Sequence, residues 1–430
     1  MTAYHRHIKP DWILIGLYLA LVFSGWIAIY AVTGNDTFSE LFNFNTSYGK
    51  QLLWIGLSFV LILLTFAFDS HFFERYSGVI YLFAIFLLLG LFVFGKNING
   101  QTNWYSFGGF SLQPSEFVKI AVALAVASIV GDNLFNVNVL KDLSKALIII
   151  LLPIFIIIIQ KDVGSAIVFL SFIFVLIRKG LNIRLFIILA ILALLFILTI
   201  KIGVKWALIS TGVLLSSIIL FAQKRQPLFI TRNFPILIII AVSTVLTITG
   251  SKYAFEHILE PHHQDRLKLW LKTESDPDKI YQLKRTYGYN NDQSIKTIAS
   301  GGFAGKGFLQ GDRTNGQFVP AQSTDYIFSA VGEEFGFLGS AFVILLFSAL
   351  ILRLIYKAEK QKNNFNKYYG YGVAAVFFTH FFVNIGMVLD LLPTVGIPLP
   401  FFSYGGSSLW SFTLLLFIFI KLDAGRIDDF

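Results

Sequence analysis

The sequence predicts an all-α polytopic integral membrane protein with about twelve transmembrane helices. Its 430 residues are 56% hydrophobic and 16% aromatic, and only 14% carry a formal charge. Soluble domains average about 25% charged residues, and the surface of a soluble chain of this size would need more polar side chains than this composition supplies. The sequence contains no cysteine, which excludes disulfides, thiol nucleophiles and cysteine-bound metal centres.

Apolar stretches recur along the whole chain, most of them close to the roughly 20 residues that a membrane-spanning helix needs. We therefore interpret residues 1–430 as a single membrane domain. The twelve predicted spans are Ile13–Val32, Leu52–Phe68, Val79–Phe94, Phe117–Val130, Ala146–Ile159, Ser165–Ile177, Leu185–Ile200, Ala207–Phe221, Phe234–Ile248, Tyr326–Leu352, Val373–Leu392 and Leu409–Ile420.

The distribution of Lys and Arg predicts the orientation of these spans. With the N-terminus inside, the inner segments carry 18 Lys and Arg, whereas the short outer loops carry five. Because such residues accumulate on the cytoplasmic side, both termini are expected in the cytoplasm. The net charge of +9 is then a topology signal rather than a sign of nucleic-acid binding. The polar segment 250–325 becomes a long extracytoplasmic loop, and we expect the chemistry on that side.

Several ionisable residues lie within or beside predicted spans. Burying a lone charge in hydrocarbon is costly, so such residues usually face a cavity or a partner. Glu116 and Lys119 are three residues apart on a helix opened by Pro114, which allows them to pair, and the simpler interpretation is a structural ion pair. Asp162 precedes a span at the outer surface, where its carboxylate can cap the helix N-terminus.

Two glycine-containing segments on the outer side have functional interpretations. The stretch around Lys306 (residues 301–307) can bring backbone N–H groups and one cation to a pyrophosphate, or it can be a flexible turn. The uncharged run Gly396–Ser408 contains two prolines. Irregular backbone at membrane depth persists only where it is buried in protein or lines a wet cavity, so this run is predicted to be re-entrant. The acidic residues of segment 250–325 are too many for this reasoning to select a general base.

Four blocks of the sequence resemble the SEDS family (shape, elongation, division and sporulation), on its rod-shape or RodA-type side. They occur in family order over about Trp12–Ile420. The blocks are Asn103-Trp104 with 108–119, Gln160–Ala166, residues 299–307 with Val319–Phe328 and Glu333-Glu334, and Asn384–Val388 with Leu392-Pro393 and Pro398–Ser408.

The resemblance implies a peptidoglycan glycosyltransferase that polymerises lipid II outside the bacterial cytoplasmic membrane, together with a class B penicillin-binding protein. It implies a catalytic base, Asp276, in the dipeptide Asp276-Pro277 that precedes Gly288-Tyr289 and Gln293-Ser294. It implies no definite cofactor, and a divalent cation stays open. The residues expected to bind the substrate are Trp104, Glu116, Lys119, Asp162, Arg266, Lys306, Gln322 and Ser403.

The chain departs from the family pattern in two places. Ten residues, Asp278–Tyr287, stand between Pro277 and Gly288, where the family usually has about three, which makes Asp278 the alternative base. Family members usually have ten spans, so residues 205–249 are interpreted as an extra helix pair. Two extra crossings leave the long loop facing outward.

Two other functions stay open at this point. Twelve spans with buried charges would suit a flippase for lipid-linked precursors, although the halves of the sequence lack the symmetry that inverted repeats leave. The chain could also be a scaffold that only recruits the penicillin-binding protein.

Overall fold

The computed structural model describes residues 10–34, 42–98, 101–107, 110–225, 229–259, 261–286 and 288–425. The chain divides into two compact units. Unit 1 comprises Met1–Leu181 and Gln293–Phe430, and unit 2 comprises Asn182–Asp292.

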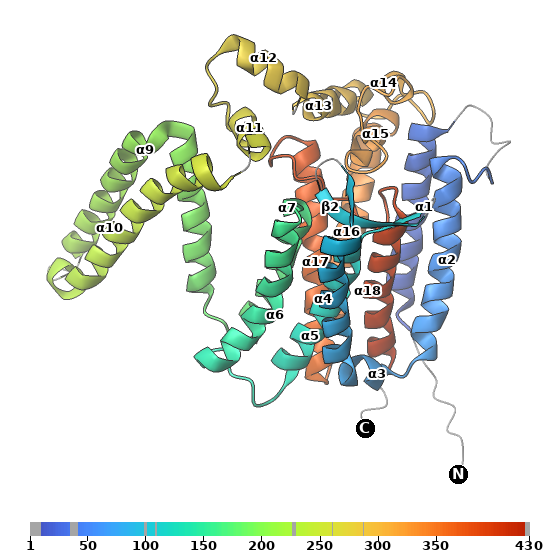
Figure 1. The fold of residues 1–430 in the computed structure, drawn as a ribbon, viewed down its shortest axis with the longest axis horizontal. Helices are drawn as coiled ribbons and strands as arrows, with labels where there is room; N and C mark the ends of the chain where they lie inside the picture. Colours follow the sequence, from blue (N-terminus) through green and yellow to red (C-terminus); the bar gives the residue numbers. More distant parts are fainter. Residues whose placement is uncertain are drawn as a thin grey trace. The chain divides into compact units, whose positions relative to one another are not determined.

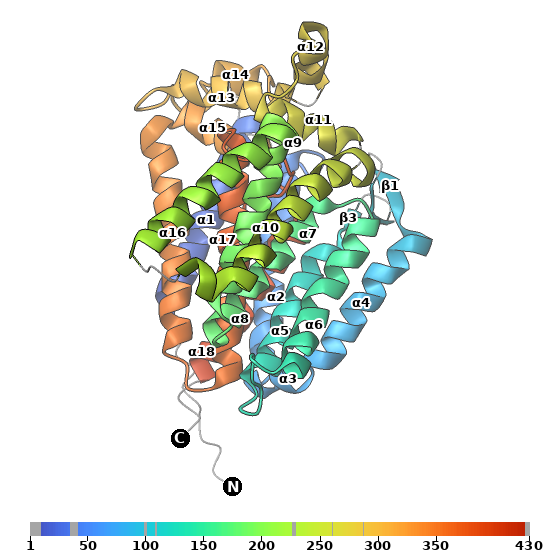
Figure 2. The same ribbon diagram turned by 90° about the vertical axis from the view of Figure 1, so that its left-hand side faces the viewer.

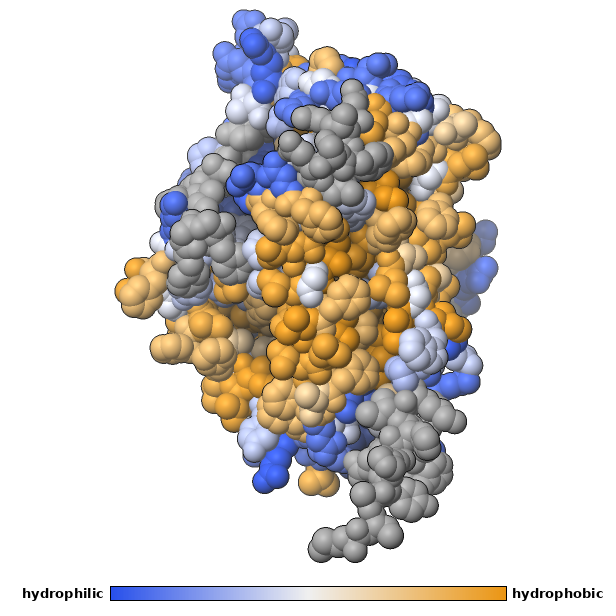
Figure 3. Space-filling model, turned by 90° about the vertical axis from the view of Figure 1, so that its right-hand side faces the viewer, coloured by the Kyte–Doolittle hydropathy of each residue, from blue (hydrophilic) through white to orange (hydrophobic). Residues whose placement is uncertain are grey.

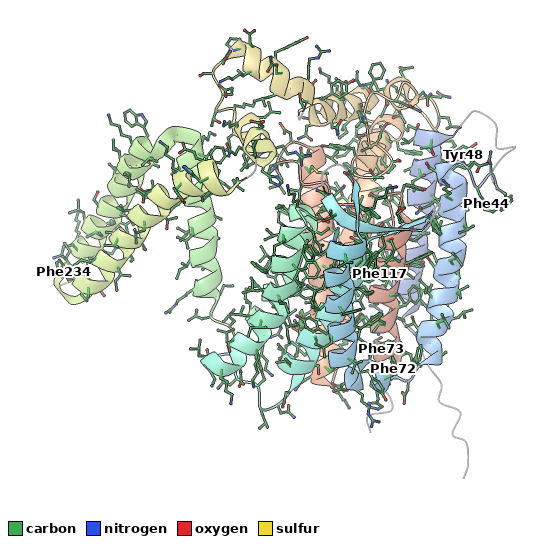
Figure 4. All side chains as sticks on the ribbon, in the orientation of Figure 1. Phe44, Tyr48, Phe72, Phe73, Phe117 and Phe234 are labelled. Carbon is green, nitrogen blue, oxygen red and sulfur yellow. The ribbon has the colours of Figure 1, made fainter. Side chains whose placement is uncertain are left out.

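Unit 1 contains a bundle of long helices that lie side by side (Figure 1). Helix α1 begins, and α18 ends, at the end of this bundle at which α3 lies. In Figure 4, Tyr48 of α2 lies at the opposite end from Phe72 and Phe73 of α3. The long helices are α1 (Trp12–Thr33), α2 (Ser47–Ala67), α4 (Ser77–Phe94), α5 (Pro114–Gly131), α6 (Leu140–Ile159), α16 (Gly336–Glu359), α17 (Asn364–Val388) and α18 (Gly406–Ala424), with the short α3 (Ser70–Arg75) between α2 and α4.

The core of unit 1 is built around α5, α17 and α18. Between 67% and 83% of the apolar window of each of these helices is buried, and α17 packs against both of the others. Alanines at every second position from Ala121 to Ala127 are buried in α5, and small side chains allow helices to approach closely. The outer helices present apolar side chains to the surroundings, and Figure 3 shows the resulting hydrophobic band between hydrophilic ends.

Two of the predicted spans of unit 1 are interrupted helices. The span Ser165–Ile177 consists of α7 (Val163–Phe169), the 3-10 turn η2 (Leu170–Phe172) and α8 (Ile173–Lys179). The predicted span Tyr326–Leu352 is divided at Phe335 into α15 (Ile327–Glu334) and α16. Of these two helices, α16 is the one long and apolar enough to cross a membrane, so α15 precedes the membrane-spanning segment. Gly336 adopts a positive φ of 62° there, and a Cβ at this position would lie 2.3 Å from the Gly305 backbone nitrogen. The break therefore lets the chain around Gly305 pack directly on the start of α16.

A small antiparallel sheet lies at the α5 N-terminal end of unit 1. It consists of β1 (Lys96–Ile98), β2 (Gln101–Phe107) and β3 (Phe110–Leu112), in the order β1-β2-β3. The sequence did not predict these strands, because the segment is short and rich in glycine and asparagine, which β-strands usually avoid. The helices α13 (Tyr289–Gly301) and α14 (Asp312–Asn315) lie at the same end as α15 (Figure 1).

Unit 2 is dominated by α9 (Ile183–Arg225) and α10 (Phe229–Tyr253), which pack against each other (Figure 2). The helix α9 contains two predicted spans, joined at Gly203, where φ is 79° and ψ is 159°. Only glycine adopts this conformation readily, so the chain changes direction there. The π-helix η3 (Ala254–Ile258), α11 (Pro261–Leu271) and α12 (Pro277–Thr286) follow.

In the described part of the chain, ten helices are long and apolar enough to cross a membrane. The second half of α9 and the interrupted helix α7–α8 account for the other two predicted spans. All twelve predicted stretches are therefore helical over most of their length, and the predicted fold class is confirmed.

Candidate active site

A buried ion pair lies just inside the N-terminal end of α5. Pro114 occupies the first turn of α5, where its missing N–H costs nothing. One turn further, Lys119 Nζ donates to Glu116 Oε2 at 2.9 Å, and both side chains are almost completely buried. Ser411 of α18 donates a longer hydrogen bond of 3.4 Å to the same carboxylate oxygen. The predicted pairing of Glu116 with Lys119 is therefore present.

The structure adds to this pair His380, whose role no pattern in the sequence indicates. His380 lies on α17 and is 1% exposed. Its Nε2 is 3.0 Å from Lys119 Nζ, and its Nδ1 is 3.0 Å from the backbone oxygen of Pro398. In the sequence His380 lies in a largely apolar span, and only the three-dimensional contacts distinguish it from an ordinary core histidine.

The Asp162 carboxylate accepts hydrogen bonds from three separate parts of the chain. It caps α7 by accepting from the Ser165 backbone N–H at 3.0 Å, as predicted, and from the Ser165 hydroxyl at 2.8 Å. Asn103 of β2 donates to it at 2.9 Å and Gln113 at 3.0 Å. Because successive side chains of a strand point to opposite faces, Trp104 faces away from Asp162, and it is partly exposed.

The run before α18 is irregular, as predicted, and other elements satisfy its backbone. Asn384 Nδ2 donates to the Ile397 oxygen at 2.8 Å, and the Gly405 N–H donates to Gln51 Oε1 at 3.2 Å. Ser403 acts within the run, because its Oγ accepts from the Leu399 N–H at 2.9 Å. We call residues 393–405 the re-entrant segment.

A second polar cluster surrounds Glu333, at the end of α15. Lys306 Nζ donates to Glu333 at 2.7 Å and to Asp312 at 3.1 Å. The backbone N–H groups of residues 313 and 314 and the hydroxyls of residues 300 and 314 also donate to Glu333. Gln322 is buried beside them and donates to the Thr314 hydroxyl at 3.3 Å.

These contacts determine the protonation of the cluster. The hydrogen bond from Lys306 to Glu333 raises the pKa of the lysine. Burial alone would raise the pKa of Glu333, but the donors from Lys306, Arg313 and Thr314 outweigh it and hold that pKa below its usual value. Lys306 is therefore a charged group that is already shared between two carboxylates.

The predicted base and Arg266 lie in unit 2. Asp276 is exposed and precedes α12, where its Oδ1 accepts from the Asp278 backbone N–H at 3.0 Å. Arg266 lies on α11. No residue of α12 is buried, so the stretch Asp278–Tyr287 that departs from the family spacing forms an exposed helix over the residues that the structure describes.

The predicted site residues thus fall into three groups. Glu116, Lys119 and Asp162 lie in the interior of unit 1, with Trp104 on the strand that contacts Asp162 and Ser403 in the re-entrant segment. Lys306 and Gln322 belong to the Glu333 cluster, and Asp276 and Arg266 belong to unit 2. Among the described residues, no three His, Cys, Asp or Glu side chains form a group that could hold a metal ion.

Together with its relatives, the helical bundle defines a multi-pass bacterial membrane protein. The sequence model of the FTSW_RODA_SPOVE family, described as cell cycle protein, matches residues 11–226 and 208–426. The chain belongs to this family, which confirms the SEDS resemblance. The two matches overlap in the second half of α9, within the expected extra helix pair.

Individual relatives cover almost the whole chain. Peptidoglycan glycosyltransferase RodA of Treponema pallidum (strain Nichols) is 31% identical over 97% of this chain and 98% of its own length. Peptidoglycan glycosyltransferase MrdB of Escherichia coli (strain K12) is 29% identical over 94% of this chain and 90% of its own.

Solved structures share the fold. A chain of a peptidoglycan synthase complex, described as coordinating polymerization and crosslinking, has a TM-score of 0.68 at 23% identity and covers 98% of this chain and 99% of its own. The rod shape determining protein RodA of Thermus thermophilus has a TM-score of 0.62 at 20% identity with the same coverage.

Proposed function

We propose that this protein is a peptidoglycan glycosyltransferase that polymerises lipid II into glycan strands during cell elongation. The observation that carries the proposal is the 31% identity, over nearly the whole of both chains, to a relative named for this activity. The family motifs coincide with the buried polar centres of unit 1, which supports the same function.

In this proposal Asp276 is the general base. A glycan 4-hydroxyl attacks the anomeric carbon of the lipid-linked chain, and it must lose its proton as the new glycosidic bond forms. Asp276 is exposed at the start of α12, so its carboxylate is accessible to such a hydroxyl. The bond to the undecaprenyl pyrophosphate breaks in the same step. Pyrophosphate is a good leaving group, so no second carboxylic acid is needed, unlike in glycoside hydrolysis.

The leaving pyrophosphate requires cations or backbone N–H groups. Arg266, Lys306 and Lys119 are the proposed cations. Lys306 already forms ion pairs with Glu333 and Asp312, and Lys119 already forms one with Glu116. In this proposal each lysine therefore binds the pyrophosphate while it stays paired with its carboxylate. Trp104, Asp162, Gln322 and Ser403 are proposed to shape the binding site.

The proposed orientation places both termini in the cytoplasm and segment 250–325 outside. The Lys and Arg bias supports it, and so does the finding that α1 begins and α18 ends at the same end of unit 1 (Figure 1). The proposed partner is a class B penicillin-binding protein, in keeping with the polymerization and crosslinking described for the synthase complex of similar fold.

The test is a polymerisation assay with purified chain, its partner transpeptidase and labelled lipid II in membrane-like particles. We expect glycan strands that a muramidase degrades. Lipid II that crosses proteoliposome membranes without being polymerised would instead indicate a flippase. Absence of both activities would indicate a scaffold that only recruits the penicillin-binding protein.

A further inference from the structure

The proposed reaction gives no role to His380, a buried titratable side chain of unit 1. His380 bonds to Lys119 through Nε2 and to the Pro398 carbonyl oxygen through Nδ1, both at 3.0 Å. A carbonyl oxygen can only accept, so Nδ1 carries a proton and donates it. The ammonium group of Lys119 can only donate, so Nε2 is the acceptor. The two partners therefore define a neutral imidazole with its proton on Nδ1.

The two ends of this imidazole contact different parts of the molecule. On one side, Lys119 is paired with Glu116 on α5, and its ammonium group lies 4.5 Å from the ring centre of Phe412 on α18. On the other side, Pro398 belongs to the re-entrant segment. His380 thus joins the buried ion pair to a segment that has no helix or sheet of its own.

The re-entrant segment depends on such contacts. Without water in a hydrocarbon layer, each backbone polar group of an irregular segment needs a partner from the protein. Gln51, Asn384 and His380 are three such partners, and they come from α2 and α17. Among these three, His380 is the one whose second contact is a charged pair.

We propose that His380 is a positioning residue that couples the Glu116–Lys119 pair to the re-entrant segment and thereby holds this segment in its substrate-binding position. The imidazole transmits the position of the ammonium group to the Pro398 carbonyl, and it does not touch the reacting atoms. The part of the proposal that concerns substrate rests on the proposed function; the coupling itself does not.

Three substitutions distinguish a histidine that links Lys119 to Pro398 from one that only donates a hydrogen bond to the Pro398 carbonyl oxygen. His380→Asn places an amide nitrogen near the position of Nδ1, so it can still donate to Pro398 but does not reach Lys119. His380→Gln places an amide oxygen near the position of Nε2. The glutamine can therefore accept a hydrogen bond from Lys119, but the Pro398 carbonyl oxygen is left without its donor. His380→Leu removes both contacts.

The first readout is the kinetics of lipid II polymerisation. We expect all three variants to raise KM about tenfold, as the loss of a hydrogen bond to a charged or buried group allows, with kcat within about twofold of wild type. A histidine that only satisfies Pro398 would make His380→Asn equal to wild type in KM. That result, or a loss of kcat at unchanged KM, would overturn the proposal.

The second readout does not depend on activity. Because the chain contains no cysteine, Ser408→Cys introduces a single thiol three residues after the re-entrant segment. We expect this thiol to react faster with a maleimide when His380→Asn or His380→Leu is also present, at an unchanged melting temperature for the Asn variant. Equal reaction rates would refute the coupling. If wild type fails to polymerise lipid II, the proposed function fails, and the thiol experiment still decides the coupling.

Discussion

Glu333 and Glu334 are adjacent in the sequence, yet their carboxylates have opposite surroundings. Glu333 accepts hydrogen bonds from Lys306 and from the chain at residues 313 and 314. The Glu334 side chain is 1% exposed, and neither of its carboxyl oxygens accepts a well-aligned hydrogen bond. Burial, reinforced by the negative charge of Glu333 and only partly offset by the Leu309 N–H, raises the pKa of Glu334 to about 7.

This raised pKa predicts a pH-dependent stability. The folded protein holds the Glu334 proton more tightly than the unfolded chain does. The resulting stabilisation is complete below the ordinary pKa of 4.5 and is lost as the pH rises towards 7. The total is roughly 3 kcal/mol. We expect the unfolding temperature of wild type in detergent to fall between pH 5 and pH 8 relative to that of Glu334→Gln, which mimics the protonated side chain.

Glu333→Gln is the matched control for this experiment. It removes a carboxylate that donors hold in its charged form, so it should destabilise the protein at pH 7 and less so at low pH. Parallel pH profiles for wild type and Glu334→Gln would show that Glu334 is ionised in the folded protein at all these pH values.

Replacing only one partner of the Glu116–Lys119 pair should greatly lower the free energy of unfolding. Lys119→Met leaves a buried carboxylate with only the long Ser411 contact, and uncompensated buried charges cost about 3–5 kcal/mol. The double variant Glu116→Gln with Lys119→Met should recover most of this loss, because no charge is left unpaired. Denaturant unfolding of the two variants measures the difference. Equal stability of Lys119→Met and wild type would contradict the pairing.

The proposed orientation can be tested by thiol labelling, since the native chain has no cysteine. Gln317→Cys and Asn138→Cys both replace exposed side chains, one between α14 and α15 and the other between α5 and α6. In intact spheroplasts, a membrane-impermeant maleimide should label Gln317→Cys only, and permeabilisation should expose Asn138→Cys. The reverse labelling pattern would show that the protein has the opposite orientation in the membrane.

The sequence was sufficient for the parts of the fold that depend on local composition. The twelve apolar stretches became helices because length and hydropathy decide whether a segment can span a membrane. The Glu116–Lys119 pair and the Asp162 cap were predictable because their partners are three residues apart. The strands from Lys96 to Leu112 were missed, because short strands carry almost no periodic signal.

Contacts between residues distant in sequence could not be predicted. His380 meets Lys119 across 261 residues, and Lys306 meets Glu333 across 27. Nothing in either local sequence indicates the partner. The break at Phe335 was missed for a related reason: hydropathy alone read Tyr326–Leu352 as one span, and the close approach of Gly305 to Gly336 that accompanies the break is a tertiary contact.

The central claim is that Asp276 is the base of a lipid II polymerase, and one assay tests it most directly. The polymerisation rate should be measured for wild type, Asp276→Ala and Asp278→Ala, each with the partner transpeptidase. The unfolding temperatures of the two variants should first be shown to equal that of wild type. A general base contributes about a hundred- to ten-thousandfold, so we predict that Asp276→Ala loses at least about a hundredfold while Asp278→Ala stays near wild type. Full activity of Asp276→Ala, with or without loss in Asp278→Ala, would contradict the assignment.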